Sequence, residues 1–347
     1  MDATYDAWTG PTAGDTVGTA GELAVLDRIV RRLPAGTPLL GPGDDCAVVA
    51  APDGRFVVTT DMMVHGPDFR WAWSSPADVG WKAAATNLSD VAAMGAVPTG
   101  LVIALAAPQD TPVAVLESFA DGVREAVTAL SPGCGVVGGD LSTSATFTVS
   151  VTAFGDLGGR PPVLRSRARV GDVLAVSGEL GRAARGLARL FREGVDPQGE
   201  PSRAATVASG ADTDPDVARQ RRPVPPIADG PAAAAAGATA MLDLSDGLAI
   251  DAGRLARASR VTLALDADGP LDATRPLDAT RPLDDLALHG GEDHGLLATF
   301  PSDVALPGGF RRVGVVVDRG AADLVRGGAP VPTTGWDPYA DWDGAAG

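Results

Sequence analysis

Carboxylates in this sequence recur at the ends of apolar runs, beside glycine, serine or threonine. Acids gathered at one place repel each other, and a fold tolerates them only when something positive lies among them. Oxygen ligands without thiolate or imidazole suit Mg²⁺, Mn²⁺ or Ca²⁺, and the sequence has no EF-hand loop that would favour calcium. The pattern therefore predicts a divalent-cation site. The acids concerned are Asp44, Asp45, Asp61, Asp90, Asp140, Asp243, Asp246 and Glu292.

Lys82 is the single lysine in 347 residues, and this restricts how the chain could bind phosphate. A Walker A loop ends in Gly-Lys-Ser/Thr and a protein kinase needs a strand lysine, and Lys82 fits neither pattern. Phosphate chemistry would have to rely on metals, backbone amides and arginine. The formal net charge of −16 argues against a nucleic-acid partner and is compatible with several bound cations. Together these features predict a metal-dependent enzyme that uses a nucleotide.

The segment 41–61 predicts the first acidic site. A glycine-rich loop, apolar residues 46–50, a Pro-Asp-Gly turn and a second apolar run at 56–59 are typical of a β-hairpin. A hairpin would bring Asp44 and Asp45 beside Asp61. Taken alone, the segment favours solvated turns, the usual fate of an Asp-Gly cluster. The acids further along the chain reverse that preference.

A helix over 75–94 should carry the next acid. Ser75 is a suitable N-cap, with Pro76 at the first helical position and Asp78 three residues on from the cap. The helix body is small and apolar, so we expect it to be packed on most sides. Asn87 and Asp90 nevertheless lie one turn apart on one face. A buried carboxylate needs a partner. We favour a metal ion or a ligand as the partner of Asp90; the alternative is that Asp90 caps a neighbouring loop.

Two further acidic motifs stand next to strands. Apolar residues 240–244 predict a strand and 248–259 a helix, and Asp243 and Asp246 flank the junction with Ser245 between them. Residues 135–137 predict a short strand that leads into Gly138-Gly139-Asp140. Glycines there would let the backbone approach a ligand closely while presenting an acid, although this motif alone is weakly specific.

The order of elements predicts an α/β fold with mixed sheets in two domains. A composition shift at 155–162 divides an N-terminal domain of 20–158 from a C-terminal domain of 159–347. Residues 1–19 should form a flexible tail and 194–216 a flexible insertion. No apolar run approaches a membrane span and no signal peptide is evident, so we expect a cytoplasmic protein without a membrane partner. Further helices are expected at 21–33, 112–130, 182–192 and 231–240, and strands at 101–106, 146–154, 173–177, 261–265, 295–300 and 312–317.

An ordered set of motifs resembles the thiamine-monophosphate kinase family, in the superfamily shared with aminoimidazole ribonucleotide synthetase and selenophosphate synthetase. The resemblance covers nearly the whole chain, and the WK…NLSD…MGA and GGED blocks separate this family from its superfamily relatives. The blocks are GPGDDCAVV (41–49), TTDMMVHGPDF (59–69), WKAAATNLSDVAAMGA (81–96), GGDLS (138–142), LRS (164–166), the Arg222-Pro223…Ile227…Gly230 run, LDLSDGL (242–248), GGEDHGLL (290–297) and GWD (335–337).

The resemblance implies a role for each matching residue. Several Mg²⁺ ions would be held by Asp45, Thr59, Thr60, Asp61, Asp90, Asp140 and Asp243, with Asp246 holding a further ion. ATP would contact Gly139, Asp140, Arg165 and Ser245. Thiamine monophosphate would face Asp68, Glu292 and Trp336, with Trp336 stacking and Glu292 pairing with the cationic thiamine.

The implied reaction is direct in-line transfer from ATP to thiamine monophosphate, giving thiamine diphosphate and ADP at the last step of thiamine diphosphate biosynthesis. No covalent nucleophile or general base is needed, because the acceptor phosphate has a second pKa of about 6 and is largely ionised at neutral pH. The resemblance also implies a two-domain ATP-binding fold like that of aminoimidazole ribonucleotide synthetase, and a homodimer formed through the N-terminal sheets.

Two departures from the family pattern bear on these roles. Pro42 replaces the usual aliphatic residue of the GDD loop, and Asp68 stands where histidine is frequent. Two rival functions within the superfamily have markers of their own. A selenophosphate synthetase should carry a reactive cysteine in an N-terminal glycine-rich loop. A hydrogenase-maturation carbamoyl dehydratase should end in cysteine, whereas this sequence ends in Gly344-Ala345-Ala346-Gly347. A non-catalytic cation-binding protein is the rival from another class, and metal-dependent affinity for ATP would exclude it.

Overall fold

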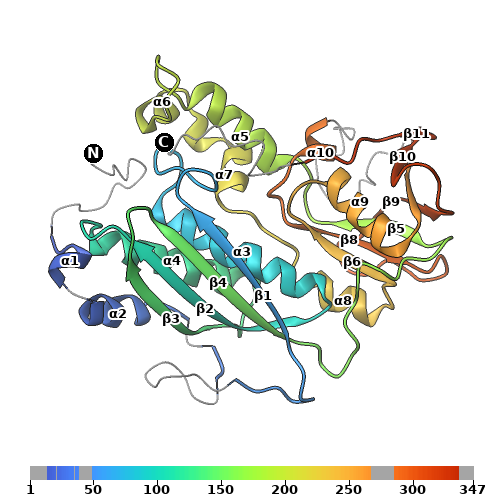
Figure 1. The fold of residues 1–347 in the computed structure, drawn as a ribbon, viewed down its shortest axis with the longest axis horizontal. Helices are drawn as coiled ribbons and strands as arrows, with labels where there is room; N and C mark the ends of the chain where they lie inside the picture. Colours follow the sequence, from blue (N-terminus) through green and yellow to red (C-terminus); the bar gives the residue numbers. More distant parts are fainter. Residues whose placement is uncertain (1–13, 21, 35, 39–48, 267–284, 336–347) are drawn as a thin grey trace.

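The computed structural model describes residues 14–20, 22–34, 36–38, 49–266 and 285–335. Their strands form two sheets (Figure 1). The first sheet has the order β1-β4-β2-β3, antiparallel except for the parallel β2–β3 pair. Two long helices, α3 and α4, cover one face of this sheet. The bounds are β1 Val57–Val64, β2 Val97–Ala107, β3 Val136–Thr143, β4 Thr148–Asp156, α3 Pro76–Ala93 and α4 Val113–Leu130, with the short α1 Val17–Ala20 and α2 Glu22–Val30 preceding them.

Helix α3 begins as its sequence predicts. Ser75 accepts from the Asp78 amide, and the Asp78 carboxylate accepts from the Ser75 amide, which completes a capping box. The helix crosses α4 closely because glycine stands at the contact: a Cβ on Gly80 would lie 2.0 Å from the Phe119 carbonyl oxygen, and one on Gly122 would lie 1.9 Å from that of Ala77. Most of α3 is buried, so its few polar side chains must have partners.

The second sheet has seven strands in the order β11-β10-β7-β9-β5-β8-β6. Helix α9 packs on one face, and α8 covers the other, where Ala93 at the end of α3 joins the same apolar cluster. This second contact puts α3 between the two sheets (Figure 1). The bounds are β5 Val173–Ser177, β6 Ala240–Leu244, β7 Thr262–Leu265, β8 Gly295–Phe300, β9 Arg311–Val317, β10 Leu324–Arg326, β11 Ala329–Pro330, α8 Asp229–Ala235, α9 Leu248–Ser259 and α10 Asp285–His289.

The segment 194–216, which we expected to be a flexible insertion, is folded. It forms α6 (Arg203–Ala208) and the 3-10 helix η1 (Ala211–Thr213), which pack beside α5 (Arg182–Glu193) and α7 (Pro215–Arg221). Ser202 caps α6, and Thr206 and Ala211 are fully buried. Asp212 accepts from both Arg203 and Arg221. The polar composition of the segment 194–216 therefore reflects these ion pairs and not exposure to solvent.

Two strands differ from their predicted extent. Strand β1 continues to Val64, and β3 runs through Gly138-Gly139-Asp140 to Thr143 instead of ending before it. Register with β2 explains the second difference, because pairing continues from Gly138 to Thr143. In the described residues β1 pairs with β4, and the other arm of the predicted hairpin, with Asp44 and Asp45, lies outside them. Among the described helices, none is long and apolar enough to cross a membrane.

Candidate active site

Acids from β1 and α3 meet beneath the first sheet. Side chains alternate along a strand, so Thr59 and Asp61 of β1 both point towards α3. The Thr59 hydroxyl donates to the Asp90 carboxylate at 2.7 Å, and the Asp61 amide donates to the Asn87 side-chain oxygen at 3.1 Å. The predicted pairing of Asn87 and Asp90 on one helix face thus meets the strand.

Burial and like charge both act on these carboxylates. Burial raises the pKa of Asp90 to about 7, and the charges of Asp243 and Asp61 add to the rise. Burial likewise raises the pKa of Asp61, with Asp243 and Asp246 adding to it. The second half of the chain therefore brings acids to the same place. We call Asp61, Asp90, Asp243 and Asp246 the acid cluster.

Asp243 and Asp246 reach the acid cluster from the end of β6 and the turn before α9. His294 Nδ1 lies 3.6 Å from Asp243, and the imidazole is buried. Arg254 pairs with Asp246 at 2.5 Å and with the buried Asp251 at 2.6 Å. Asp246 is therefore the one acid of the cluster whose charge an arginine already offsets.

The acid cluster suits magnesium in a particular way. Its donors are carboxylate oxygens whose mutual repulsion a cation would relieve. Across the described ranges, however, no three aspartate, glutamate, histidine or cysteine side chains converge closely enough to form a ready-made metal site. That arrangement fits Mg²⁺, which usually keeps several waters and binds one or two carboxylates together with substrate phosphates.

Thr60 and Asp140, two other predicted ligands, have side chains on the opposite face of the sheet. Met62, Ser150, Ala104 and Asp140 are paired neighbours on the four strands, so their side chains lie on the same face of the sheet. Of these residues, Met62, Ala104 and Asp140 are exposed. The Thr60 hydroxyl donates to the Val151 carbonyl on β4 instead of facing α3. Three strand spacings, about 14 Å, also separate β3 from β1. These two side chains do not join the acid cluster of their own chain.

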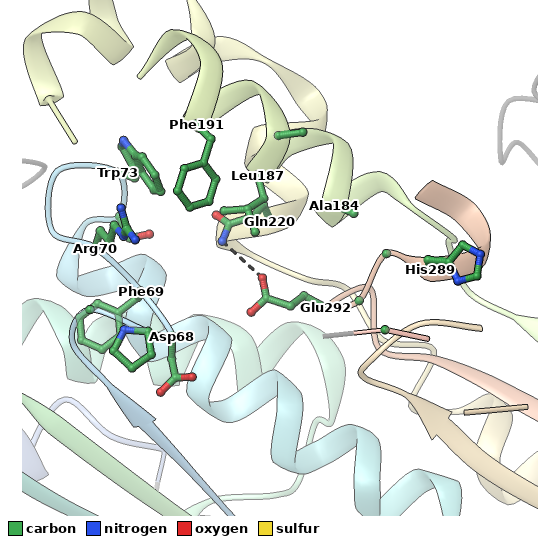
Figure 2. A pocket seen from close by; sticks show the side chains of 17 residues that line it. Asp68, Phe69, Arg70, Trp73, Ala184, Leu187, Phe191, Gln220, His289 and Glu292 are labelled. Carbon is green, nitrogen blue, oxygen red and sulfur yellow. Dashed lines mark hydrogen bonds between the residues drawn. The ribbon is translucent and has the colours of Figure 1, made fainter. Parts of the chain in front are cut away.

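Beside the acid cluster lies a cavity of about 450 Å³ (Figure 2). One wall is the loop between β1 and α3, with Asp68, Phe69, Arg70 and Trp73. The opposite wall is α5, with Ala184, Leu187, Ala188 and Phe191. Gln220 and Glu292 also line the cavity. The Arg70 guanidinium lies 5.0 Å from the ring centroids of both Trp73 and Phe191 and so ties the two walls together.

Glu292 is held at the cavity by unusual backbone and by two side chains. Its φ is +68°, a left-handed conformation that non-glycine residues rarely adopt, and its amide donates to the Ser245 carbonyl at 2.7 Å. Lys82 Nζ lies 2.7 Å from Glu292 Oε1, and Gln220 Nε2 lies 3.4 Å from Oε2. Glu292 therefore already has a cationic partner, which the sequence did not predict.

The next residue, Asp293, has a structural role. Its carboxylate accepts from the amides of Gly181 and Ala183 at the start of α5. Burial raises the pKa of Asp293 to about 6, although both amides favour the ionised form. Asp293 thus anchors the GGED segment to the helix that forms the cavity wall. Glu292 faces the cavity and His294 contacts the acid cluster, so this one segment joins the two.

The remaining predicted residues are placed as follows. Asp68 lines the cavity and accepts from the Val64 amide at 2.6 Å, and burial raises its pKa. Ser245 is half-buried beside the acid cluster, whereas the Arg165 side chain is exposed in the connection between the sheets. Gly139 is exposed on β3. Asp45 and Trp336 lie outside the described residues, although Gly335 lines the cavity.

Sequence reasoning missed Trp73, Phe191, Arg70 and Gln220 as cavity residues. Trp73 and Arg70 stand close in sequence to the predicted substrate residue Asp68, and this proximity was the available clue. Phe191 and Gln220 belong to helices whose position depends on the tertiary fold. Nothing in their local sequence distinguishes them from ordinary helix residues.

Comparisons with known proteins agree with this geometry. Residues 43–157 match the family model described as AIR synthase related protein, N-terminal domain. The fold and site thus place the chain in the AIR synthase-related class. Within it, a thiamine-monophosphate kinase from Mycobacterium tuberculosis is 45% identical over 339 residues, covering 96% of each chain.

Two solved structures show the same similarity over the full fold. The crystal structure of a thiamine-monophosphate kinase from Stenotrophomonas maltophilia has a TM-score of 0.68 at 30% identity, covering 88% of this chain and 97% of that one. AaThiL complexed with AMPPCP and TMP has a TM-score of 0.64 at 28% identity, covering 93% and 99%. The chain belongs to the thiamine-monophosphate kinase family.

Proposed function

We propose that this protein transfers the γ-phosphoryl group of ATP to thiamine monophosphate, giving thiamine diphosphate and ADP. The observation that carries the proposal is the junction of a mostly apolar cavity with a cluster of half-buried acids. The cavity offers aromatic walls and carboxylates to a flat cationic ring, and the acid cluster offers ligands for the metals that accompany phosphates. The relatives' names and the complex of AaThiL with AMPPCP and TMP support the same reaction.

In this proposal the acceptor ring enters the cavity and its phosphate points to the acid cluster. Asp68 and Glu292 would face the ring, and Trp336 would stack on it. Asp61, Asp90 and Asp243 would ligate Mg²⁺, with Thr59 orienting Asp90 through its 2.7 Å hydrogen bond. Asp45 would complete this set, and Asp246, while paired with Arg254, could share a further ion. Bound magnesium would neutralise charge between two anionic substrates.

In this proposal the side chains of the cavity and the acid cluster position substrates and do not move a proton. The acceptor oxygen is already largely ionised at neutral pH, so none of these residues needs to act as a general base. Fixed geometry between the cavity and the acid cluster would supply the rate enhancement, by holding acceptor oxygen and γ-phosphorus in line. Because α3 contributes to both places, its rigidity bears directly on that alignment.

The nucleotide would contact Gly139 and Asp140 on β3. A second cavity, of about 460 Å³, lies there beside Gly138 and Gly139. Asp140 follows directly and would bind a metal accompanying the phosphates, while Arg165 and Ser245 would contact the nucleotide from the C-terminal half. We also propose two domains, residues 20–158 with the first sheet and residues 159–347 with the second.

The reaction is tested by an ATP- and Mg²⁺-dependent assay with thiamine monophosphate and free thiamine as competing acceptors. We expect thiamine diphosphate from the monophosphate, detected by chromatography, and no product when Mg²⁺ is chelated. Product from free thiamine alone would show that the acceptor is wrong. Metal binding without any ATP-dependent product would favour a non-catalytic cation-binding protein.

We also propose a homodimer formed through the open face of the first sheet. That face exposes Val58 by 56% and Met62 by 61%, with Phe56 beside them, while the other face is covered by helices. An apolar sheet face of this kind is typical of a protein interface. It would place Asp140 at the contact between the two copies rather than in its own chain's acid cluster.

Replacing Met62 by glutamate should convert the dimer to a monomer. A charge buried at the centre of an apolar interface costs several kcal/mol, enough to dissociate a micromolar dimer. Light scattering after size exclusion should report twice the 35.0 kDa chain mass for the wild type and a single chain mass for the variant. Val207→Glu, at an equally exposed position on α6, is the control and should not change the mass. A monomeric wild type would contradict the proposal.

A further inference from the structure

Lys82 is a buried lysine in an ion pair with the half-buried Glu292, and the proposed roles leave this pair unexplained. Its side chain is 5% exposed, that of Glu292 is 34% exposed, and their charged atoms lie 2.7 Å apart. The pair joins the middle of α3 to a segment 210 residues further along the chain. Gln220 contacts the other Glu292 oxygen. Two charges held this firmly at the edge of a ligand cavity need a reason beyond stability, because buried ion pairs contribute little to stability.

The Lys82 ammonium stands between the cavity and the acid cluster. Its charge acts on Asp68 in the cavity wall, whose pKa it lowers against the rise caused by burial. It also acts on His294, whose pKa it lowers and which lies 3.6 Å from Asp243. Along α3, Lys82 and Asp90 are eight residues apart, about 12 Å. A molecule that reaches from the cavity to the acid cluster would therefore pass over Lys82.

A buried pair of this kind discriminates between ligands by their charge. A ligand that is only a cation would compete for Glu292 and leave the Lys82 ammonium buried without a partner. A ligand that is only an anion would attract Lys82 and leave Glu292 unpaired. Either case leaves a charge unpaired, and the cost is larger for Lys82 because its side chain is buried. A ligand with a cationic ring and an anionic group at the right separation satisfies both, since each charge exchanges one partner for another.

We propose that thiamine monophosphate inserts into the Lys82–Glu292 ion pair, its thiazolium ring taking Glu292 as counter-ion and its phosphate taking Lys82. This inference rests on the proposed function and deepens it. Lys82 becomes a substrate-binding residue, and the pair becomes the determinant that selects the phosphorylated acceptor over free thiamine. Selection then operates at binding, before any nucleotide is present.

The test is calorimetric titration of the full-length protein with thiamine monophosphate and with thiamine, in Mg²⁺ and without nucleotide. The wild type should bind the monophosphate more tightly. Lys82→Met should weaken binding of the monophosphate about ten- to a hundredfold, the range expected for a lost charged hydrogen bond, and leave thiamine binding unchanged or tighter. Lys82→Arg should retain most of the preference. Arg32→Met, which breaks the ion pair to Asp121 away from the site, should behave as wild type.

Three results would overturn the inference. Equal weakening of both ligands in Lys82→Met would mean that Lys82 merely positions Glu292, and unchanged binding of both would mean that it has no role. Should circular dichroism show that Lys82→Met is unfolded, the double variant Lys82→Met/Glu292→Gln removes both charges and should bind the two ligands with similar affinity. The third result would be that this double variant still prefers thiamine monophosphate over thiamine as strongly as the wild type does. Failure of the proposed function looks different, because the wild type would then form no thiamine diphosphate.

Discussion

Replacing Asp90 by asparagine should lower turnover by about a thousandfold or more while the protein stays folded. Asp90 lies beside Asp61 and Thr59 of the N-terminal half and is also affected by the charge of Asp243 from the C-terminal half. A metal ion held by Asp90 would therefore have ligands from both halves of the chain. Losing one ligand charge at a metal that stabilises phosphoryl transfer removes several kcal/mol of transition-state stabilisation. The measurement is thiamine diphosphate formation at saturating ATP, Mg²⁺ and thiamine monophosphate.

Stability of the same variant separates a functional role for Asp90 from a structural one. Asparagine keeps the size and can accept from Thr59, and it removes one charge from a repelling cluster. The metal-free variant should therefore unfold at the same or a higher temperature than wild type, while Mg²⁺ should stabilise it less. Asp303→Asn, at an exposed position on the other sheet's margin, is the matched control and should leave turnover unchanged. Near wild-type turnover in Asp90→Asn would refute the metal role.

Filling the cavity should produce the second large effect. Ala188 lines the cavity from α5 yet is exposed to solvent, so a tryptophan there can be accommodated without disturbing the core. Its indole would occupy much of the roughly 450 Å³ space. We expect KM for thiamine monophosphate to rise at least about tenfold, because the added indole takes up space that the substrate ring needs. The affinity for ATP should not change, since none of the residues assigned to the nucleotide lines this cavity.

Ala204→Trp provides the control for this variant. Ala204 is an exposed alanine on the neighbouring helix α6, and it does not line the cavity. The same substitution there should leave both kinetic constants as in wild type. An Ala188→Trp enzyme with unchanged KM for the monophosphate would mean that the acceptor binds elsewhere. A rise in KM for ATP as well would indicate that α5 had shifted.

Much of the local structure was predictable from the sequence, because local rules govern it. The Ser75–Asp78 capping box starts α3, and the strand-to-helix junction at Asp243–Ser245 forms as expected. Segment 194–216 shows where composition misleads. Its polar residues, such as Arg203 and Asp212, pair with each other, and burial of Thr206 between them is not visible in a polarity profile.

The acidic constellation shows the same division. Its residue types indicated cation and phosphate chemistry, and its motifs indicated the family, since both are properties of the chain itself. The sheet decided which acids meet. Strand alternation sends Thr59 and Asp61 to one face and Thr60 to the other, and the register of β3 puts Asp140 on the open face. A list of motif residues carries no information about faces.

The lone lysine marks the limit of what the sequence by itself determined. Its rarity excluded the familiar lysine-based phosphate sites, and that conclusion needed only a residue count. Its partner, Glu292, is 210 residues away and is brought to it only because α3 packs between the two sheets. Pairing over such a separation depends on how the packed layers fit together, so only the tertiary structure could reveal it.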